Sequence, residues 1–164
     1  MNPCPCGYYN HPTKECNCPP GAVQKYLSRI SGPLLDRIDI HIEVVPVELD
    51  KITSTAESEP SAAIRSRVIA AREIQTARFR HHQGIYCNAQ MTSPLLKKYC
   101  SLDDKCTALL KIAMQRFGLS ARAYDRIIKL SRTIADLDHS KEIKPEYIAE
   151  AIQYRSLDRE EWGG

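Results

Sequence analysis

Four cysteines near the start of the chain have the type and spacing that a metal site requires. They form a C-x-C-x9-C-x-C pattern made of Cys4, Cys6, Cys16 and Cys18. The glycine, asparagine and prolines around and between the two pairs are typical of a loop. Four thiolates in one loop can bind zinc tetrahedrally, with His11 as a spare ligand. The residues leave a second interpretation open, in which four reduced cysteines lie in an insertion without metal.

Arg37 is the second candidate for chemistry, because it lies at the end of a short apolar turn. Pro33 presets φ for a first helical turn, and the two leucines after it are expected to bury and fix that turn. A guanidinium stays charged and can bind phosphate in a bidentate manner. Spacing leaves two alternatives: Arg37 binds a phosphate, or it forms an ion pair with Asp36 or Asp39.

Composition narrows the class of protein. The chain has 164 residues, 43% of them hydrophobic and 26% charged, which is ordinary globular usage. A net charge of +3 is too small to indicate nucleic-acid binding by itself. No apolar run is long enough to span a membrane, and no secretion signal is present, so we expect no membrane partner. The odd count of 7 cysteines favours a reducing cytoplasm with metal or free thiols over a disulfide framework.

The elements before residue 50 are expected to position these groups. Pro19 and Pro20 precede a short helix, and residues 38–44 alternate strictly between apolar and polar types, which predicts a strand. Residues 51–61 are poor in apolar types and are interpreted as a linker. We therefore divide the chain into 1–50, the linker, a helical bundle over 62–157, and a tail over 158–164.

Helical periodicity dominates the chain after the linker. The pattern predicts a long helix over 61–79, a short one over 93–99, and a third after a capping box that begins at Ser101. Gly118 is expected to end the third helix and Ser120 to cap the fourth. The last helix is expected to begin at Lys144–Glu146. On residues alone, the fold class is mainly α.

The helix over 61–79 has a basic exterior next to two histidines. Its apolar stripe is predicted to be Ile64, Val68, Ala71 and Ile74. Its basic residues are Arg65, Arg67, Arg72, Arg78 and Arg80, and His81 and His82 follow. Such a face either follows a phosphate backbone or is an ordinary solvated surface, and it lacks the aromatic residues of a base-stacking platform.

Longer motifs resemble one family. The segments are MNPCPCG over 1–7, CNC over 16–18, YLSRISGPLLDRID over 26–39, and GLSARAYDRI over 118–127. Together they resemble the magnesium-chelatase-like AAA+ ATPases of the YifB/ComM family. The resemblance covers only the C-terminal part of such a protein, because no G-x-x-x-x-G-K-[ST] phosphate loop is present. Met1 is accordingly expected to correspond to an internal position of the family.

The resemblance implies a fold and roles for single residues. The implied fold is a lid-type helical bundle preceded by the C-terminal remnant of an α/β AAA+ core. Asn2 would be the sensor-1 residue, Arg37 a catalytic arginine finger acting on the neighbouring subunit, and Arg122 the sensor-2 arginine that contacts ATP. By spacing alone, Arg122 is equally a surface arginine paired with Asp125, and Arg126 is an equally good candidate for the sensor.

The resemblance also implies a function. The parent protein would be an oligomeric ATPase that uses ATP and Mg²⁺ and assembles into a ring, with a hexamer as the expected form. Its work would be DNA remodelling such as branch migration, or chelatase-type protein remodelling. This chain, without the phosphate loop, is expected to be inactive alone. The competing class is a non-enzymatic, zinc-stapled helical module that binds protein or nucleic acid.

Overall fold

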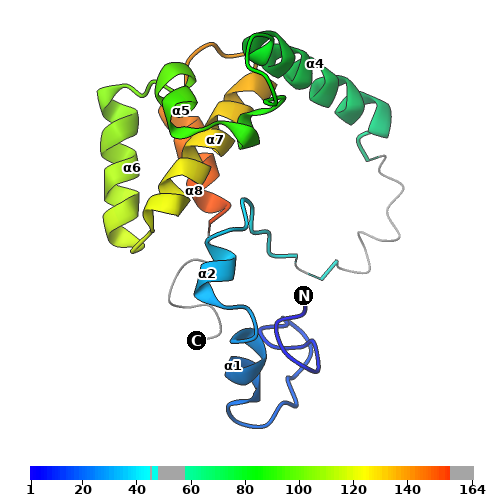
Figure 1. The fold of residues 1–164 in the computed structure, drawn as a ribbon. Helices are drawn as coiled ribbons and strands as arrows, with labels where there is room; N and C mark the ends of the chain where they lie inside the picture. The colour runs from blue at the N-terminus through cyan, green and yellow to red at the C-terminus, as the bar shows by residue number, and fades with distance from the viewer. Residues whose placement is uncertain (45, 48–57, 156–164) are drawn as a thin grey trace.

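The computed structural model describes residues 1–44, 46–47 and 58–155, and these residues are mainly helical with no β-strand. Most of the predicted linker and the whole predicted tail lie outside the described residues. Figure 1 shows an N-terminal part with two short helices and a larger helical bundle. The predicted fold class is confirmed.

The bundle is built around α7. This helix packs against α8, α4, α5 and the short 3₁₀ helix η1, and α6 packs against α8. The helices of the bundle are α4 (Ser61–Phe79), η1 (Asn88–Gln90), α5 (Ser93–Tyr99), α6 (Asp104–Arg116), α7 (Ala121–Leu137) and α8 (Pro145–Gln153). Their bounds agree closely with the periodicity in the sequence. A continuous core of buried residues, with Leu110, Ile127 and Ile148 almost fully enclosed, joins these helices.

Local capping explains where the central helices begin and end. The Ser120 hydroxyl accepts a hydrogen bond from the Ala123 amide at 3.2 Å, as predicted. The cap of α6 is Asp103, whose carboxylate accepts from the Cys106 amide at 2.7 Å, so the predicted capping box at Ser101 is wrong by two residues. Gly118 adopts a φ of +58°, the left-handed conformation that ends a helix at little cost for glycine.

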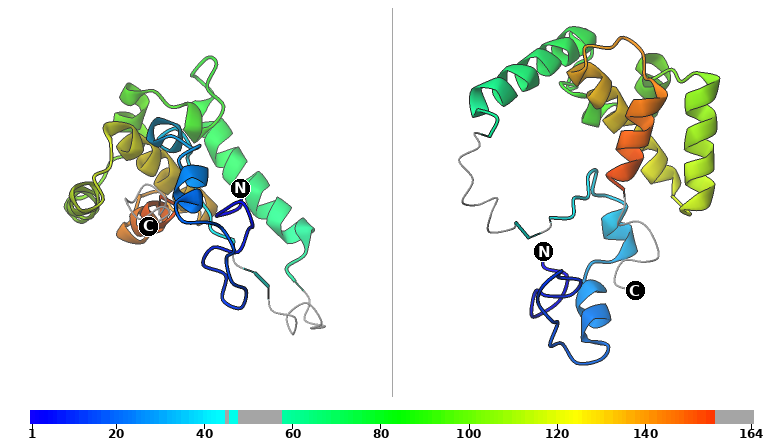
Figure 2. Two further views of the ribbon diagram at one scale, coloured as in Figure 1. Left: turned by 90° about the horizontal axis from the view of Figure 1, so that it is seen from below. Right: turned by 180° about the vertical axis from the view of Figure 1, so that it is seen from behind.

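Only the C-terminal half of α4 packs against the bundle. Ala71 is buried and Ile74 half-buried, but Ile64 and Val68 are each 44% exposed, so the predicted stripe is wrong for the first half of the helix. Figure 2 shows that this half projects away from the other helices. The apolar residues there find no neighbouring helix among the described residues.

The predicted strand over 38–44 does not form. A strand needs a partner for its backbone groups, and the described residues provide no second strand. The alternating apolar side chains are instead exposed, from Ile38 at 38% to Val44 at 87%. The sequence pattern is therefore that of a strand, but the pairing it requires is missing here.

The N-terminal part contains α1 (Ala22–Leu27) and α2 (Gly32–Leu35). Within α1 only Leu27 is buried, and α2 has no buried residue. Leu34 is 47% exposed and Leu35 is half-buried, so the prediction that both leucines bury the turn is wrong. Something other than apolar packing must fix the turn that carries Arg37.

Candidate functional site

The turn that carries Arg37 is attached to the bundle through the residues that directly follow α8. The carboxylate of Asp36 lies 3.9 Å from the guanidinium of Arg155, which also donates a hydrogen bond to the carbonyl of Ile38. A few residues on, the His41 amide donates to the carbonyl of Tyr154 at 2.7 Å. Residues before and after Arg37 are thus held by Tyr154 and Arg155, the two residues that follow α8.

Arg37 itself is exposed. Its guanidinium donates to the Pro33 carbonyl at 3.2 Å, one turn earlier. Its neighbouring acids are paired elsewhere: Asp36 with Arg155 and Asp39 with Arg126. Within the described ranges Arg37 forms no ion pair, so the alternative pairing with Asp36 or Asp39 is not what the structure shows. The guanidinium is left facing solvent with most of its donors available.

Arg122 is the second residue of α7 and is also exposed. Amide groups at a helix N-terminus carry partial positive charge, which together with a guanidinium favours an anion. Arg126, the other candidate by spacing, is instead engaged by Asp39. The position of Arg122 therefore suits an anion contact better than that of Arg126.

The Arg37 turn and the start of the Arg122 helix lie on one cleft of about 290 Å³. Its walls are Gly32, Pro33, Leu35 and Asp36 on one side and residues 118–120 on the other. The fold therefore places the α2 turn next to the N-terminus of α7, although the two are more than eighty residues apart in the sequence.

Asn2 does not line this cleft and lies beside the cysteine loop. It is exposed, and its side-chain amide nitrogen lies 3.6 Å from where a Cβ on Gly7 would be, so it borders the cysteine loop. Figure 1 shows the N-terminus near this loop and away from the start of α7. The described residues show no contact between Asn2 and Arg37 or Arg122, so this chain by itself does not assemble the three.

The four cysteines converge as predicted. Their sulfur atoms all lie within 4.8 Å of one another. The Cys4–Cys6, Cys4–Cys16 and Cys6–Cys16 sulfur pairs are 3.3, 3.7 and 3.6 Å apart. A tetrahedral zinc–thiolate site with bonds of about 2.3 Å has sulfur–sulfur edges of about 3.8 Å, so the cluster can hold a metal ion. His11 does not lie in this cluster, and its Nδ1 accepts hydrogen bonds from the amides of Thr13 and Lys14.

The thiols of the cluster also differ in acidity. A backbone hydrogen bond from Tyr8 is the main cause that lowers the pKa of Cys6 to about 6. For Cys18, a backbone hydrogen bond with Cys6 also favours a lower pKa. Desolvation and hydrogen bonds with the other three thiols outweigh it, and the pKa of Cys18 is raised to about 12. Close thiols that share one site titrate in separate steps, because each negative charge opposes the next. A divalent cation would remove that opposition.

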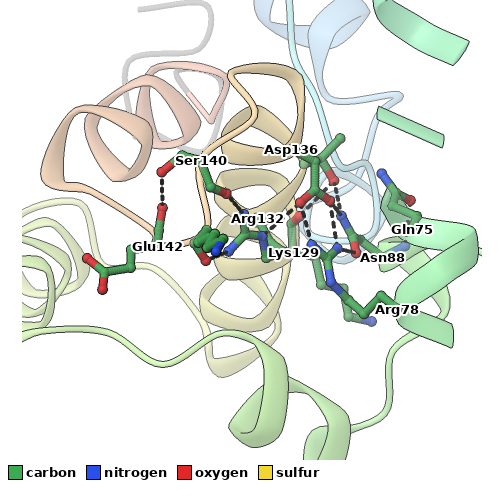
Figure 3. A network of polar contacts seen from close by, with 10 residues as sticks. Gln75, Arg78, Asn88, Lys129, Arg132, Asp136, Ser140 and Glu142 are labelled. Atoms are coloured by element: carbon green, nitrogen blue, oxygen red, sulfur yellow. Dashed lines mark hydrogen bonds and ion pairs between the residues drawn. The ribbon is translucent and has the colours of Figure 1, made fainter. Parts of the chain in front are cut away.

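Sequence reasoning missed a buried polar network inside the bundle (Figure 3). Asp136 is fully buried and accepts two hydrogen bonds from Arg78, at 2.5 and 2.6 Å, and one from Asn88 at 2.8 Å. Arg132, also buried, donates to Asp136 at 3.1 Å and to two carbonyls of the loop over 138–144. The sequence placed Arg78 on a basic exterior, which the structure corrects.

The network has a structural role. It joins α4, η1 and α7 through a charged group that is removed from water, and such a group must be fully paired to be tolerated. The i,i+4 spacing of Arg132 and Asp136 was a signal for one of these contacts. Nothing in the spacing of Arg78 indicated a partner 58 residues away.

None of the described helices is both long enough and apolar enough to cross a membrane.

The helical lid-type bundle, the exposed arginine turn and the cysteine cluster define a class of protein. Residues 58–155 match the family described as magnesium chelatase, subunit ChlI C-terminal, and residues 1–52 match the family described as magnesium chelatase, subunit ChlI. The chain belongs to this magnesium-chelatase-like family.

Individual relatives agree with this assignment. The chain is 39% identical over 160 residues to competence protein ComM of Haemophilus influenzae, covering 97% of this chain. It is 39% identical over 162 residues to the uncharacterized protein YifB of Escherichia coli, again covering 97% of this chain. An uncharacterized protein of Mycobacterium tuberculosis is 32% identical over 154 residues, or 94% of this chain. The chain spans about 30% of the length of each of these relatives.

Proposed function

We propose that this chain acts as the C-terminal portion of an oligomeric AAA+ ATPase, in which Arg37 is an arginine finger directed at the nucleotide of a neighbouring subunit. The observation that carries the proposal is the state of Arg37. It is exposed and free of any acidic partner among the described residues, on a turn whose flanking residues are fixed to the bundle. Phosphoryl transfer relies on positioned positive charge, and an arginine supplied by a neighbour typically contributes about 10³–10⁵ in rate.

Two further residues complete the proposed machinery. Arg122, at the N-terminus of α7, is the sensor-2 residue for the γ-phosphate, and Asn2 is the sensor-1 residue. ATP and Mg²⁺ are the proposed cofactors, bound with the help of phosphate-loop and metal-holding segments that this sequence does not contain. Asn2 borders the cysteine loop here, so its sensor role requires the strand that would precede it in a longer protein.

The central experiment replaces Arg37 in the full-length protein that contains these residues. Arg37→Ala is expected to lower kcat by about two orders of magnitude, or about 3 kcal/mol of transition-state stabilisation, with little change in nucleotide affinity. Arg37→Lys is expected to rescue poorly, because an ammonium group lacks the planar fork of donors. The 164-residue chain alone is expected to show no ATP turnover.

Mixed assemblies test whether Arg37 acts on a neighbour. A subunit with a disabled phosphate loop still carries Arg37, and an Arg37→Ala subunit still carries an intact nucleotide pocket. Together they are expected to regain part of the turnover that each lacks alone. Co-assembled mixtures that remain as inactive as their parts would assign Arg37 to a role within its own subunit.

The proposed work of the assembled ring is remodelling of DNA. The support is the similarity to a protein named for competence and the exposed arginines Arg65 and Arg72 of α4. Duplex unwinding or branch migration by the full-length protein, coupled to ATP turnover, is the expected result. Chelatase-type remodelling of a partner protein is the alternative, and DNA-independent turnover with no DNA binding would favour it.

The proposed location is the cytoplasm. The seven cysteines form no disulfide, which agrees with a reducing compartment.

A non-enzymatic, zinc-stapled module is the second candidate function; it rests on the cysteine cluster together with the position of Asn2, which lies beside the cysteine loop and away from the start of α7. In either function we propose that Cys4, Cys6, Cys16 and Cys18 hold one Zn²⁺ ion. Protein purified under reducing conditions is expected to contain about one zinc per chain. Metal analysis that finds none, with all four thiols open to titration, would leave the loop as an insertion without metal.

A further inference from the structure

The short turn that carries Arg37 has no apolar anchor of its own. Helix α2 has four residues, none of them buried, and isolated helices of this length are not stable in water. A catalytic arginine on such a turn would be poorly placed unless other contacts fixed it. The described contacts that do so come from α7 and from the end of α8.

Arg155 is the most buried of the side chains that make these contacts. It is 2% exposed, and a guanidinium so far from water must be paired. Two of its partners come from the turn: it donates to the Ile38 carbonyl, and its guanidinium lies 3.9 Å from the Asp36 carboxylate. These partners are the residues directly before and after Arg37. Arg155 therefore contacts the chain on both sides of the proposed finger, through the Asp36 side chain before it and the Ile38 carbonyl after it.

Two other contacts act on the same segment. The His41 amide donates to the Tyr154 carbonyl, so the chain next to Arg155 also binds the segment that follows the turn. Arg126 of α7 forms an ion pair with Asp39, with the two side chains 28% and 55% exposed. A pair this open to solvent contributes little free energy alone, but it adds a second helix to the attachment.

We propose that Arg155, supported by Arg126, is a positioning residue that locks the Arg37 turn to the helical bundle. This inference rests on the proposed function of Arg37. Since Arg122 begins the helix that also carries Arg126, Arg37 and Arg122 belong to one rigid unit. A movement of the bundle that follows a change at Arg122 then moves Arg37 relative to the neighbouring subunit. The coupling between the two proposed nucleotide contacts is thus built into one chain.

The first experiment measures amide hydrogen exchange in the 164-residue chain and requires no ATPase activity. Arg155→Gln is expected to raise the exchange rate of the amides over 36–41 by about tenfold or more, because the contacts that close this segment are lost. The Asp36→Asn variant tests the same attachment from the turn side and leaves the bundle untouched. Lys144→Gln, which removes an exposed charge at the other end of α8, is the matched control and is expected to change nothing over 36–41.

Exchange at α7 amides shows whether each variant keeps the bundle folded. If protection over 36–41 is unchanged in both Arg155→Gln and Asp36→Asn while α7 stays protected, the locking role is refuted. That outcome leaves the role of Arg37 in catalysis unaffected, because the two are measured separately.

The second experiment is a double-mutant cycle in the full-length ATPase. Arg155→Gln is expected to lower kcat by about tenfold or more with KM nearly unchanged, because a small misplacement of a catalytic group is costly. In the Arg37→Ala background the same change is expected to cost no further activity, since Arg155 acts only through Arg37. Losses that simply add would overturn the proposal. An Arg37→Ala variant with normal turnover would instead refute the proposed function, whatever the exchange data show.

Discussion

The two parts of this molecule are held together in different ways. Residues 58–155 enclose a continuous apolar core in which several large side chains are fully buried. In the described residues before position 48, the buried residues are only Cys4, Leu27 and His41. That part is organised by a sulfur cluster and by polar contacts to the bundle. The bundle is therefore stabilised mainly by apolar burial. The N-terminal part depends instead on individual sulfur and polar contacts, each of which a single substitution or metal removal can break.

This contrast separates stability from the proposed function. The candidate groups Asn2, Arg37 and the four cysteines all lie in the weakly packed part, and Arg122 lies at an exposed helix end. A group that contacts a neighbouring subunit needs to remain accessible, which a packed core does not allow, whereas the four cysteines need only converge, and Cys4 is fully buried. The bundle then serves as the rigid base to which the Arg37 turn is attached.

Metal removal is expected to give the largest difference between the two parts. Zinc binding to a structural site is worth about 10–16 kcal/mol in small domains, and few other contacts hold residues 1–20 together. A chelator under reducing conditions should therefore abolish amide protection around Cys4 to Cys18 while the melting temperature of the bundle stays within a few degrees. Loss of bundle structure on chelation would contradict the division into two separately stabilised parts.

Breaking the buried network in the bundle is expected to have the next largest effect. Asp136→Ala leaves the guanidinium groups of Arg78 and Arg132 without their shared carboxylate, and loss of one partner of a buried ion pair costs about 3–5 kcal/mol. Chemical denaturation followed by circular dichroism measures the change in free energy of unfolding. Asp125→Ala on the same helix removes an acid that is half-exposed, and is expected to cost less than about 1 kcal/mol.

The sequence predicted the strongly packed part best. The helix bounds and the Ser120 cap follow from periodicity and local hydrogen bonding, which depend on neighbours in the chain. Contacts between distant residues were not predictable this way. Arg78 was predicted to lie on a basic exterior, Arg126 was a candidate sensor, and no prediction was made for Arg155, yet their carboxylate or carbonyl partners lie 58 or more residues away. The prediction of a strand over 38–44 was wrong for a similar reason. Alternation of apolar and polar residues indicates a preference for extended structure, but it does not show that a second strand is available to pair with it.

Among the candidate site residues, the sequence correctly predicted convergence only for the four cysteines. Their C-x-C pairs are local, and a loop of nine residues brings the pairs together. For Arg37, the sequence left open an ion pair with Asp36 or Asp39, and the structure gives both acids to other arginines. The placement of the α2 turn beside the start of α7 depends on tertiary packing, so no spacing rule revealed the cleft between them.

Removal of residues 1–55 tests whether the bundle folds alone. The core residues of the bundle all lie after position 58, so the shortened chain is expected to remain helical and to unfold cooperatively. It loses the contacts of Arg155 with the turn and the hydrogen bond between His41 and Tyr154, but Arg155 regains water. The expected loss is about 1–2 kcal/mol. Little helical circular dichroism in the shortened chain would show that both parts share one core.

The smallest expected effect lies on α4 and shows where along this helix the packed core begins. Ile64, in the projecting half of the helix, is 44% exposed, whereas Ile127 of α7 is fully buried. Ile127→Ala removes packed methyl groups from the core and is expected to cost about 2–5 kcal/mol. Ile64→Ala removes the same atoms from a partly hydrated surface and raises helix propensity, so the free energy of unfolding should change by less than about 0.5 kcal/mol. The two substitutions are chemically identical, so the difference between them measures burial directly. Equal costs would contradict this assignment, because they would mean that the first half of α4 is packed as tightly as the core around Ile127.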